Sequence, residues 1–248
     1  MDILTIVGLI GGFASLLIGA VLKGASIPFL IQPSAFVIVV PTTLFASLIT
    51  VPLPKFSKII EGLKMAFGTS KEDLLQVKVQ LVELANVVRR EGMLALETKA
   101  DEITNPFIKR AVDLMVLGVE EHVLVESLES EIARVEEDYE IAIEYWKTAA
   151  ESAPTFGLVG AVFGLMKALK SLDNANELAH GISAAFVATV YGISFSYLVF
   201  GPISKKIKVK SKEEILKMQM VLDACRMMIR GENPRLIEEK LNSYVEVK

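Results

Sequence analysis

The sequence predicts an all-α integral membrane protein with four transmembrane helices and a helical cytoplasmic domain between the second and the third. Three observations lead to this fold class. The 248 residues are 52% hydrophobic, with a mean hydropathy of +0.47, which is too apolar for an ordinary soluble domain. Yet 23% of the residues are charged, so the apolar residues must be concentrated in segments. Four such segments approach the roughly 20 residues that a bilayer-crossing helix needs.

The first two spans lie within residues 1–54. Leu4 to Leu22 carries no charge, and Ser34 to Leu53 is the second uncharged segment. Pro41 lies inside the second segment, where its missing N–H predicts a bent helix. The N-terminus differs from a cleavable signal peptide, because Asp2 stands in place of a basic region and the apolar run begins at once.

The chain changes character over residues 55–150, which are charged and rich in helix-forming residues. Apolar residues recur at helical spacing over Ser70 to Val88, and Gly92 interrupts the pattern. Val119 to Ala150 has the pattern of one long helix. Neither glycine nor proline separates it from Pro154, so we expect this helix to continue into the third span.

The third and fourth spans occupy residues 151–204, over about Ala153 to Leu172 and Ile182 to Ile203. The third opens at a proline, Pro154, and we expect the fourth to close at another, Pro202.

Residues 205–248 follow as a cytoplasmic C-terminal segment. An amphipathic helix is expected over Lys212 to Arg230, ended by Gly231. A last helix is expected from Pro234, with Asn233 as its cap.

Small residues recur on one helical face of the third span and one of the fourth. Such faces let helix backbones approach closely in lipid. Two interpretations stay open: the faces dock a partner helix, or they pack against each other and against the first two spans. The residues are Gly157, Gly160, Ala161, Gly164 and Ala168, and Ala185, Thr189, Gly192 and Ser196.

Positive charges predict the orientation. Lys55 and Lys58 follow the second span, and a lysine cluster at residues 205–210 follows the fourth. The positive-inside bias therefore places both termini and the charged segment in the cytoplasm. Lys167 and Lys170 run against this bias, and we expect them to reach the outer interface or line a polar vestibule.

Composition and motifs exclude several classes of function. The sequence has no phosphate loop, metalloprotease motif or paired cysteines, so no catalytic residue and no metal site is predicted. His122 and His180 are too far apart to share a metal. Cys225 is the single cysteine, and we expect it to be buried in a helix. A net charge of −4 argues against nucleic acid as a partner.

The four spans offer hydroxyl groups but no carboxylate. A protein that moves protons or sodium usually needs an ionisable group at mid-depth. If this chain conducts ions, a partner helix must therefore supply the acid.

Several stretches resemble the MotA branch of the MotA, TolQ and ExbB family. PTFGLVGAVFGL and FVATVYGISFSYLVFGPI resemble its third and fourth spans, each with a key proline. RREGMLALE resembles its charged cytoplasmic motif, and GENPRLIEEKL its C-terminal motif. The two-and-two division of the spans around a cytoplasmic block matches as well.

The resemblance implies a subunit of the flagellar motor stator in the bacterial inner membrane. Several copies, five in the current model, would form a ring around MotB-like single-span helices, each supplying an ion-binding aspartate. H⁺ or Na⁺ would be the coupling ion, with no cofactor, and the ring would act on the rotor protein FliG.

The resemblance also implies roles for individual residues. Pro154 and Pro202 match prolines tied to ion-driven conformational change, and Thr189 matches a threonine that faces the MotB-like helix. Phe186 lies one turn before Thr189. Ala161 stands where sodium-driven members carry threonine, which favours protons.

For rotor contact, the resemblance implies Arg89 and Glu97. Helix geometry places Arg90, seven residues before Glu97, on the same face as that glutamate, so both arginines are kept as candidates.

Two other functions stay open. One is an energiser of the ExbB or TolQ kind that acts on an outer-membrane partner, although such proteins typically have three spans. The other is a membrane scaffold that conducts nothing.

Overall fold

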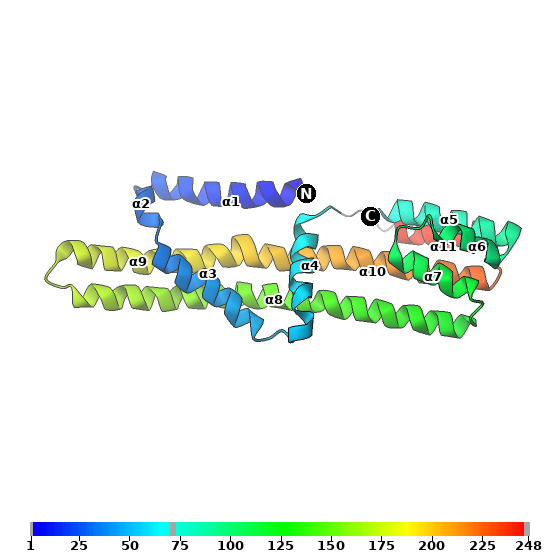
Figure 1. Ribbon diagram of the computed structural model, residues 1–248. Coiled ribbons are helices and arrows are strands. Elements are labelled where there is room, and N and C mark those ends of the chain that lie inside the picture. Colours follow the sequence, from blue (N-terminus) through cyan, green and yellow to red (C-terminus); the bar gives the residue numbers. More distant parts are fainter. Residues whose placement is uncertain (1, 70–72, 246–248) are drawn as a thin grey trace. The chain divides into compact units, whose positions relative to one another are not determined.

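A computed structural model describes residues 2–69 and 73–245, and within these ranges all regular structure is helical (Figure 1). Four helical segments are long and apolar enough to cross a membrane: Ile3–Leu22, Ile27–Leu48, Glu121–Lys170 and Ala175–Ile229. The predicted all-α membrane fold is thus confirmed. The chain forms two compact units, residues 1–69 with 138–209 and residues 70–137 with 210–248, here called the first and second unit.

The first unit begins with α1 (Ile3–Leu22), whose N-terminus is capped by the Asp2 carboxylate, which accepts the Thr5 N–H. No residue of α1 is buried, although the helix is uncharged. A helix this apolar and this exposed requires lipid or another apolar surface around it. The short α2 (Ile27–Leu30) and α3 (Pro33–Leu48) follow, with Pro41 inside α3.

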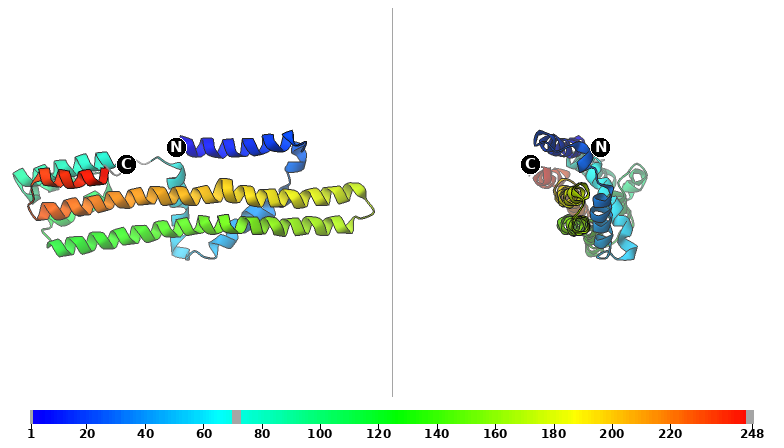
Figure 2. Two further views of the ribbon diagram at one scale, coloured as in Figure 1. Left: turned by 180° about the vertical axis from the view of Figure 1, so that it is seen from behind. Right: turned by 90° about the vertical axis from the view of Figure 1, so that its left-hand side faces the viewer.

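A crosswise helix, α4 (Phe56–Phe67), follows the 3₁₀ turn η1 (Leu53–Lys55). It lies across the long helices α8 (Glu121–Lys170) and α10 (Gly201–Ile229) in the first unit (Figures 1 and 2). Gly62 makes the crossing possible. A Cβ atom there would lie 2.7 Å from the Ala142 Cβ and 3.2 Å from the Ile207 Cδ1.

Helix α8 runs unbroken through Pro154, so the prediction of one long helix continuing into the third span is confirmed. Within the first unit it lies antiparallel to α9 (Ala175–Ser194) (Figures 1 and 2). Where α3, α4, α8 and α10 meet, apolar side chains form the core. Its largest buried members are Ile59, Ile143, Tyr145, Trp146, Phe200, Ile203 and Ile207.

The fourth span differs from its prediction at both ends. Helix α9 begins at Ala175, earlier than the expected Ile182. Pro202 does not end the helix, because a π-helical turn η3 (Phe195–Phe200) precedes it and α10 continues directly to Ile229. In this turn the Gly201 N–H reaches back five residues to the Ser196 carbonyl. The wider register absorbs the irregularity that a proline imposes, since Pro202 has no N–H to donate.

The second unit contains α5 (Leu74–Glu91), η2 (Met93–Ala95), α6 (Leu96–Ala100), α7 (Pro106–Val116) and α11 (Pro234–Val245), with the ends of α8 and α10. The predicted start of its first helix at Ser70 lies outside the described residues. Asp73 and Gln76 form a capping box at the start of α5. Gly92, at φ +87°, ends α5 in a conformation that favours glycine. As expected, Cys225 is buried, and burial raises the pKa of its thiol to about 12.

Candidate functional site

The small-residue faces of the third and fourth spans pack against each other. A Cβ atom at Gly157 would lie 2.9 Å from the Ala188 carbonyl oxygen, and one at Gly164 would lie 2.7 Å from the Ala185 nitrogen. One at Gly192 would lie 2.7 Å from the Ala153 carbonyl oxygen. Of the two interpretations left open by the sequence, mutual packing holds for these glycines. Other faces of the two helices are therefore the ones available to a partner.

The two prolines of the predicted ion pathway lie in different surroundings. Pro154 is half-buried in α8, and its Cα lies 3.1 Å from where a Gly192 Cβ would be. Pro202 is exposed at the start of α10 and shares a groove with Leu4 and Thr5 of α1. Gly192 and Pro202 are ten positions apart along the fourth span, or about 15 Å of helix.

Thr189 and Phe186 lie together on α9. Phe186 is 70% exposed and lines an apolar groove with Phe29 of α2. Thr189 is half-buried, and its hydroxyl donates to the Ala185 carbonyl at 3.3 Å. This bond uses the hydroxyl proton and leaves the oxygen lone pairs free to accept from water or to coordinate a cation. Ala161 is half-buried on α8.

An exposed apolar stripe runs along the fourth span beside Thr189. Its members recur at helical spacing and face away from the small-residue contact with α8. Such a stripe suits a lipid or protein neighbour within the bilayer. The residues are Ile182, Phe186, Val190, Ile193 and Tyr197.

Metal-ligating side chains do not cluster in the described ranges. Residues 2–69 and 73–245 contain no group of three or more His, Cys, Asp or Glu that could hold a metal ion. Within their predicted bounds the spans carry no carboxylate, because Glu177 lies in the first turn of α9, before the predicted start of the fourth span at Ile182. The hydroxyls of the spans cannot bind a titrating proton on their own.

The three candidate rotor contacts lie at the end of α5 and in α6, and all three are exposed. The Arg89 guanidinium donates to the Gly231 carbonyl at 3.4 Å, and this neutral partner leaves its charge uncompensated. Arg90 and Glu97 form no hydrogen bond or ion pair with any residue in the described part of the chain. All three charges are therefore available to an external partner.

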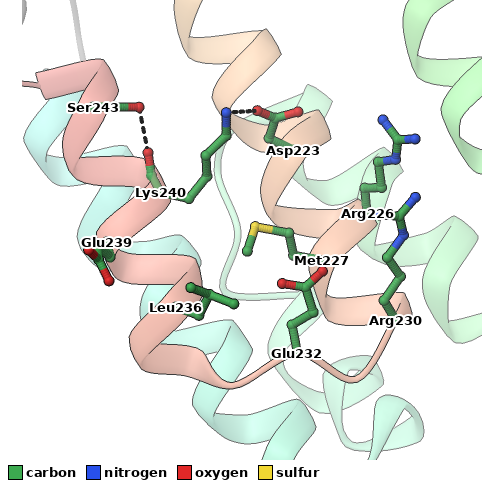
Figure 3. A pocket seen from close by; sticks show the side chains of 9 residues that line it. All are labelled: Asp223, Arg226, Met227, Arg230, Glu232, Leu236, Glu239, Lys240 and Ser243. Carbon is green, nitrogen blue, oxygen red and sulfur yellow. Dashed lines mark hydrogen bonds and ion pairs between the residues drawn. The ribbon is translucent and has the colours of Figure 1, made fainter.

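A cluster of partly exposed ion pairs joins α8 to α10 within the second unit. Glu121, at the start of α8, accepts hydrogen bonds from Arg226 and Arg230 of α10 at 2.6–3.0 Å. The bonds from Arg230 and then Arg226 lower the pKa of Glu121 to about 2. In Figure 3 both arginines point away from α11, whereas Lys240 of α11 pairs with Asp223 at 3.3 Å.

Sequence reasoning missed one ionic site in the first unit. Asp138 of α8 is buried, and it pairs with Lys55 at 2.5 Å and Lys58 at 3.4 Å, at the start of α4. Burial alone would raise the pKa of the Asp138 carboxyl, but the Lys55 hydrogen bond and the Lys58 charge together hold it below its ordinary value. The sequence spacing indicates this burial, because Asp138 lies four residues before Ala142 and seven before Tyr145, on the buried face of α8.

Comparison with known proteins gives consistent matches. Residues 99–220 match the model of the MotA/TolQ/ExbB proton channel family. Motility protein A of Helicobacter pylori is 40% identical over 99% of this chain and 95% of its own length. The C. jejuni MotAB structure superposes with a TM-score of 0.93 at 38% identity, covering 98% of this chain and 96% of that one. The flagellar MotAB stator complex of Bacillus subtilis gives a TM-score of 0.88 at 33% identity, covering 97% and 94%.

Proposed function

This chain belongs to the MotA/TolQ/ExbB proton channel family, and we propose that it is the ring subunit of a flagellar motor stator. The observation that carries the proposal is the similarity to motility protein A and to MotAB stator structures over nearly the whole chain. The family is one of stator and ion-channel subunits rather than enzymes. The full-length match favours this function over an ExbB- or TolQ-like energiser and over a scaffold that conducts nothing.

The subunit works with a single-span partner of the MotB type. The spans contain no carboxylate within their predicted bounds, so the ion-binding acid comes from the partner's aspartate. Because the small-residue faces are occupied, the partner contacts the exposed stripe beside Thr189, with Phe186 as its most exposed member near that threonine. Several copies, five in the proposed ring, enclose the partner helices.

The coupling ion is H⁺ in this proposal. Ala161 offers no oxygen where a sodium pathway would gain one, and a proton needs only a carboxylate and a water path. The Thr189 oxygen retains free lone pairs, so Na⁺ is the alternative coupling ion. The flux experiment described below decides between H⁺ and Na⁺. Pro154 and Pro202 are the positions at which the third and fourth spans change conformation as the ion passes.

The chain spans the bacterial inner membrane several times, with both termini in the cytoplasm. The lysines after the second and fourth spans support this orientation, and all of them except Lys210 belong to the first unit. The second unit then faces the rotor protein FliG.

An ion-flux assay tests the proposed function. The chain is reconstituted into vesicles alone, with its MotB-type partner, and with that partner carrying Asp→Asn at its membrane aspartate. We expect flux only with the intact partner, driven by a proton gradient and insensitive to sodium. Flux from the chain alone contradicts the requirement for a partner acid, and absence of flux in every arm favours the scaffold.

Charge reversal tests the rotor contact. We expect Arg89→Glu combined with Arg90→Glu to reduce swimming, because two exposed positive charges that steer FliG become negative. Each exposed contact contributes about 1 kcal/mol or less, so the single reversals should have mild effects. Swimming speed and membrane accumulation are measured together.

A reversed charge on FliG should restore swimming to the double variant. Reversal of Arg134, an exposed arginine elsewhere in the second unit, serves as the control. Full motility with both arginines and Glu97 replaced by alanine would exclude a rotor contact here.

A further inference from the structure

Pro154 leaves one backbone carbonyl of α8 without its helical donor. In an α-helix the carbonyl of residue i accepts the N–H of residue i+4, so the Ala150 carbonyl would pair with position 154. Proline has no N–H, and the helix nevertheless continues on both sides. Near a membrane, an unpaired backbone carbonyl is costly, so another donor is required.

Ser196 of the fourth span supplies that donor. Its hydroxyl donates to the Ala150 carbonyl at 2.6 Å, across the contact between α8 and η3. Ser196 is only 5% exposed, so no water competes for the carbonyl from that side. One turn earlier on the same face of the fourth span, Gly192 lies against the backbone of Ala153 and Pro154. The two helices are therefore in backbone contact where the bond forms.

The same serine is part of the second irregularity. Its own carbonyl accepts the Gly201 N–H in the π turn that precedes Pro202. Ser196 therefore takes part in two hydrogen bonds, one to the carbonyl that Pro154 leaves unpaired in α8 and one in the π turn that accommodates Pro202. A change of bend at one proline cannot leave the other unaffected while both bonds hold.

We propose that Ser196 is a positioning residue of the stator, one that makes the third and fourth spans change conformation together at their two prolines. This inference rests on the proposed function. It adds a residue that touches neither the ion nor the partner and acts through the Ala150 carbonyl. π turns inside otherwise regular helices are frequent at functional sites, which agrees with this role.

A double-mutant cycle between positions 154 and 196 tests the bond. In the wild-type background, Ser196→Ala leaves the Ala150 carbonyl unpaired, and we expect a lower unfolding temperature of the purified complex. In a Pro154→Ala background, the new N–H pairs with that carbonyl. The same Ser196→Ala change should then lower the unfolding temperature by less than half as much.

Ser204→Ala is the matched control. Ser204 is buried and donates to the Ile143 carbonyl at 2.9 Å across the same two helices. Ile143 lies in the regular part of α8, four residues before Lys147, so its carbonyl keeps a helical donor whatever stands at position 154. The effect of Ser204→Ala should therefore be equal in both backgrounds.

Swimming speed distinguishes a positioning role of Ser196 from a role in packing alone. We expect Ser196→Ala to swim at less than half the wild-type speed at normal membrane accumulation, and Ser196→Thr, which keeps the hydroxyl, to restore it. Should Ser196→Ala fail to accumulate, Ser196→Cys keeps the shape with a weaker donor and should swim at an intermediate speed. Equal Ser196→Ala effects in both proline backgrounds, or wild-type swimming of Ser196→Ala, would overturn the proposal.

The flux assay distinguishes this failure from failure of the proposed function. If the wild-type complex carries no ions and restores no swimming, the stator assignment fails. If the wild-type complex conducts and swims while the cycle is additive, only the role of Ser196 fails.

Discussion

Gly192→Val is expected to abolish motility by forcing the third and fourth spans apart. A Cβ at this position would lie 2.7 Å from the Ala153 carbonyl oxygen, 2.9 Å from the Gly157 Cα and 3.1 Å from the Pro154 Cα. All three are main-chain atoms, so no side-chain rotation relieves the clash. Overpacking costs about 1–3 kcal/mol and occasionally more, and a clash with backbone lies at the upper end of that range.

The effect should be graded with side-chain size. Gly192→Ala already brings its Cβ below 3 Å from α8 and should lower the unfolding temperature of the complex, with Gly192→Val lowering it further. Gly19→Val is the matched control, since a Cβ at Gly19 of α1 meets nothing within 4 Å. Both changes add the same apolar group to an apolar helix. Wild-type swimming and accumulation of Gly192→Val would refute close packing at this contact.

The small-residue pattern of the third and fourth spans predicts which helix faces are closely packed but not which helix packs against them. A four-residue spacing identifies the face of a helix and predicts a close neighbour, because period and residue size determine both. It does not identify the neighbour, since a partner helix and a second span of the same chain satisfy the pattern equally. Contacts such as Gly157 with Ala188 depend on tertiary arrangement, which the spacing leaves undetermined.

Pro202 illustrates a local rule overridden by its surroundings. Proline usually ends a helix, so the fourth span was expected to close there. Instead, the π turn shifts the register before it and Ser196 links that turn to α8. The four spans and the long α8 followed from apolar length and the absence of breakers, which are properties of the sequence itself. The π turn contains Ser196, whose hydroxyl donates to the Ala150 carbonyl 46 positions away, and a contact between residues so far apart depends on the tertiary arrangement.

The Lys55→Met, Lys58→Met double variant is expected to destabilise the first unit strongly. Both lysines pair with Asp138, whose side chain is 8% exposed, so their removal leaves a buried carboxylate without either cation. Removing one side of a buried ion pair costs about 3–5 kcal/mol, and we expect the lower end because the lysine side chains are 30% and 27% exposed. Thermal unfolding of the purified complex at pH 7 measures the loss.

Asp138→Asn should cost less than the double lysine change, because the two lysines can turn toward water whereas the carboxylate cannot. Adding Asp138→Asn to the double lysine variant should then restore part of the lost stability, because it removes the buried carboxylate that has lost both lysines. Glu140→Gln, at an exposed position of α8 nearby, is the control and should have little effect. Equal costs for the acid and the lysine changes would contradict a buried pair.

The pH dependence of stability provides an independent test of the ion pair between Asp138 and the two lysines. The pKa of Asp138 lies below its ordinary value of 3.8 in the folded protein, so its contribution is present above that value. It is lost as the pH falls below 3.8 and through the folded pKa, where the carboxylate takes up a proton. In the double lysine variant, burial acts without either cation and raises the pKa of the same carboxyl above its ordinary value. The stability difference between the wild type and the double lysine variant should therefore begin to shrink above pH 3.8 and continue to shrink as the pH falls through the lower pKa of the wild type. A difference that stays constant down to the acid limit of folding would show that the lysines act by packing their side chains rather than by charge. In that event α4 would be held on α8 mainly by the close approach at Gly62.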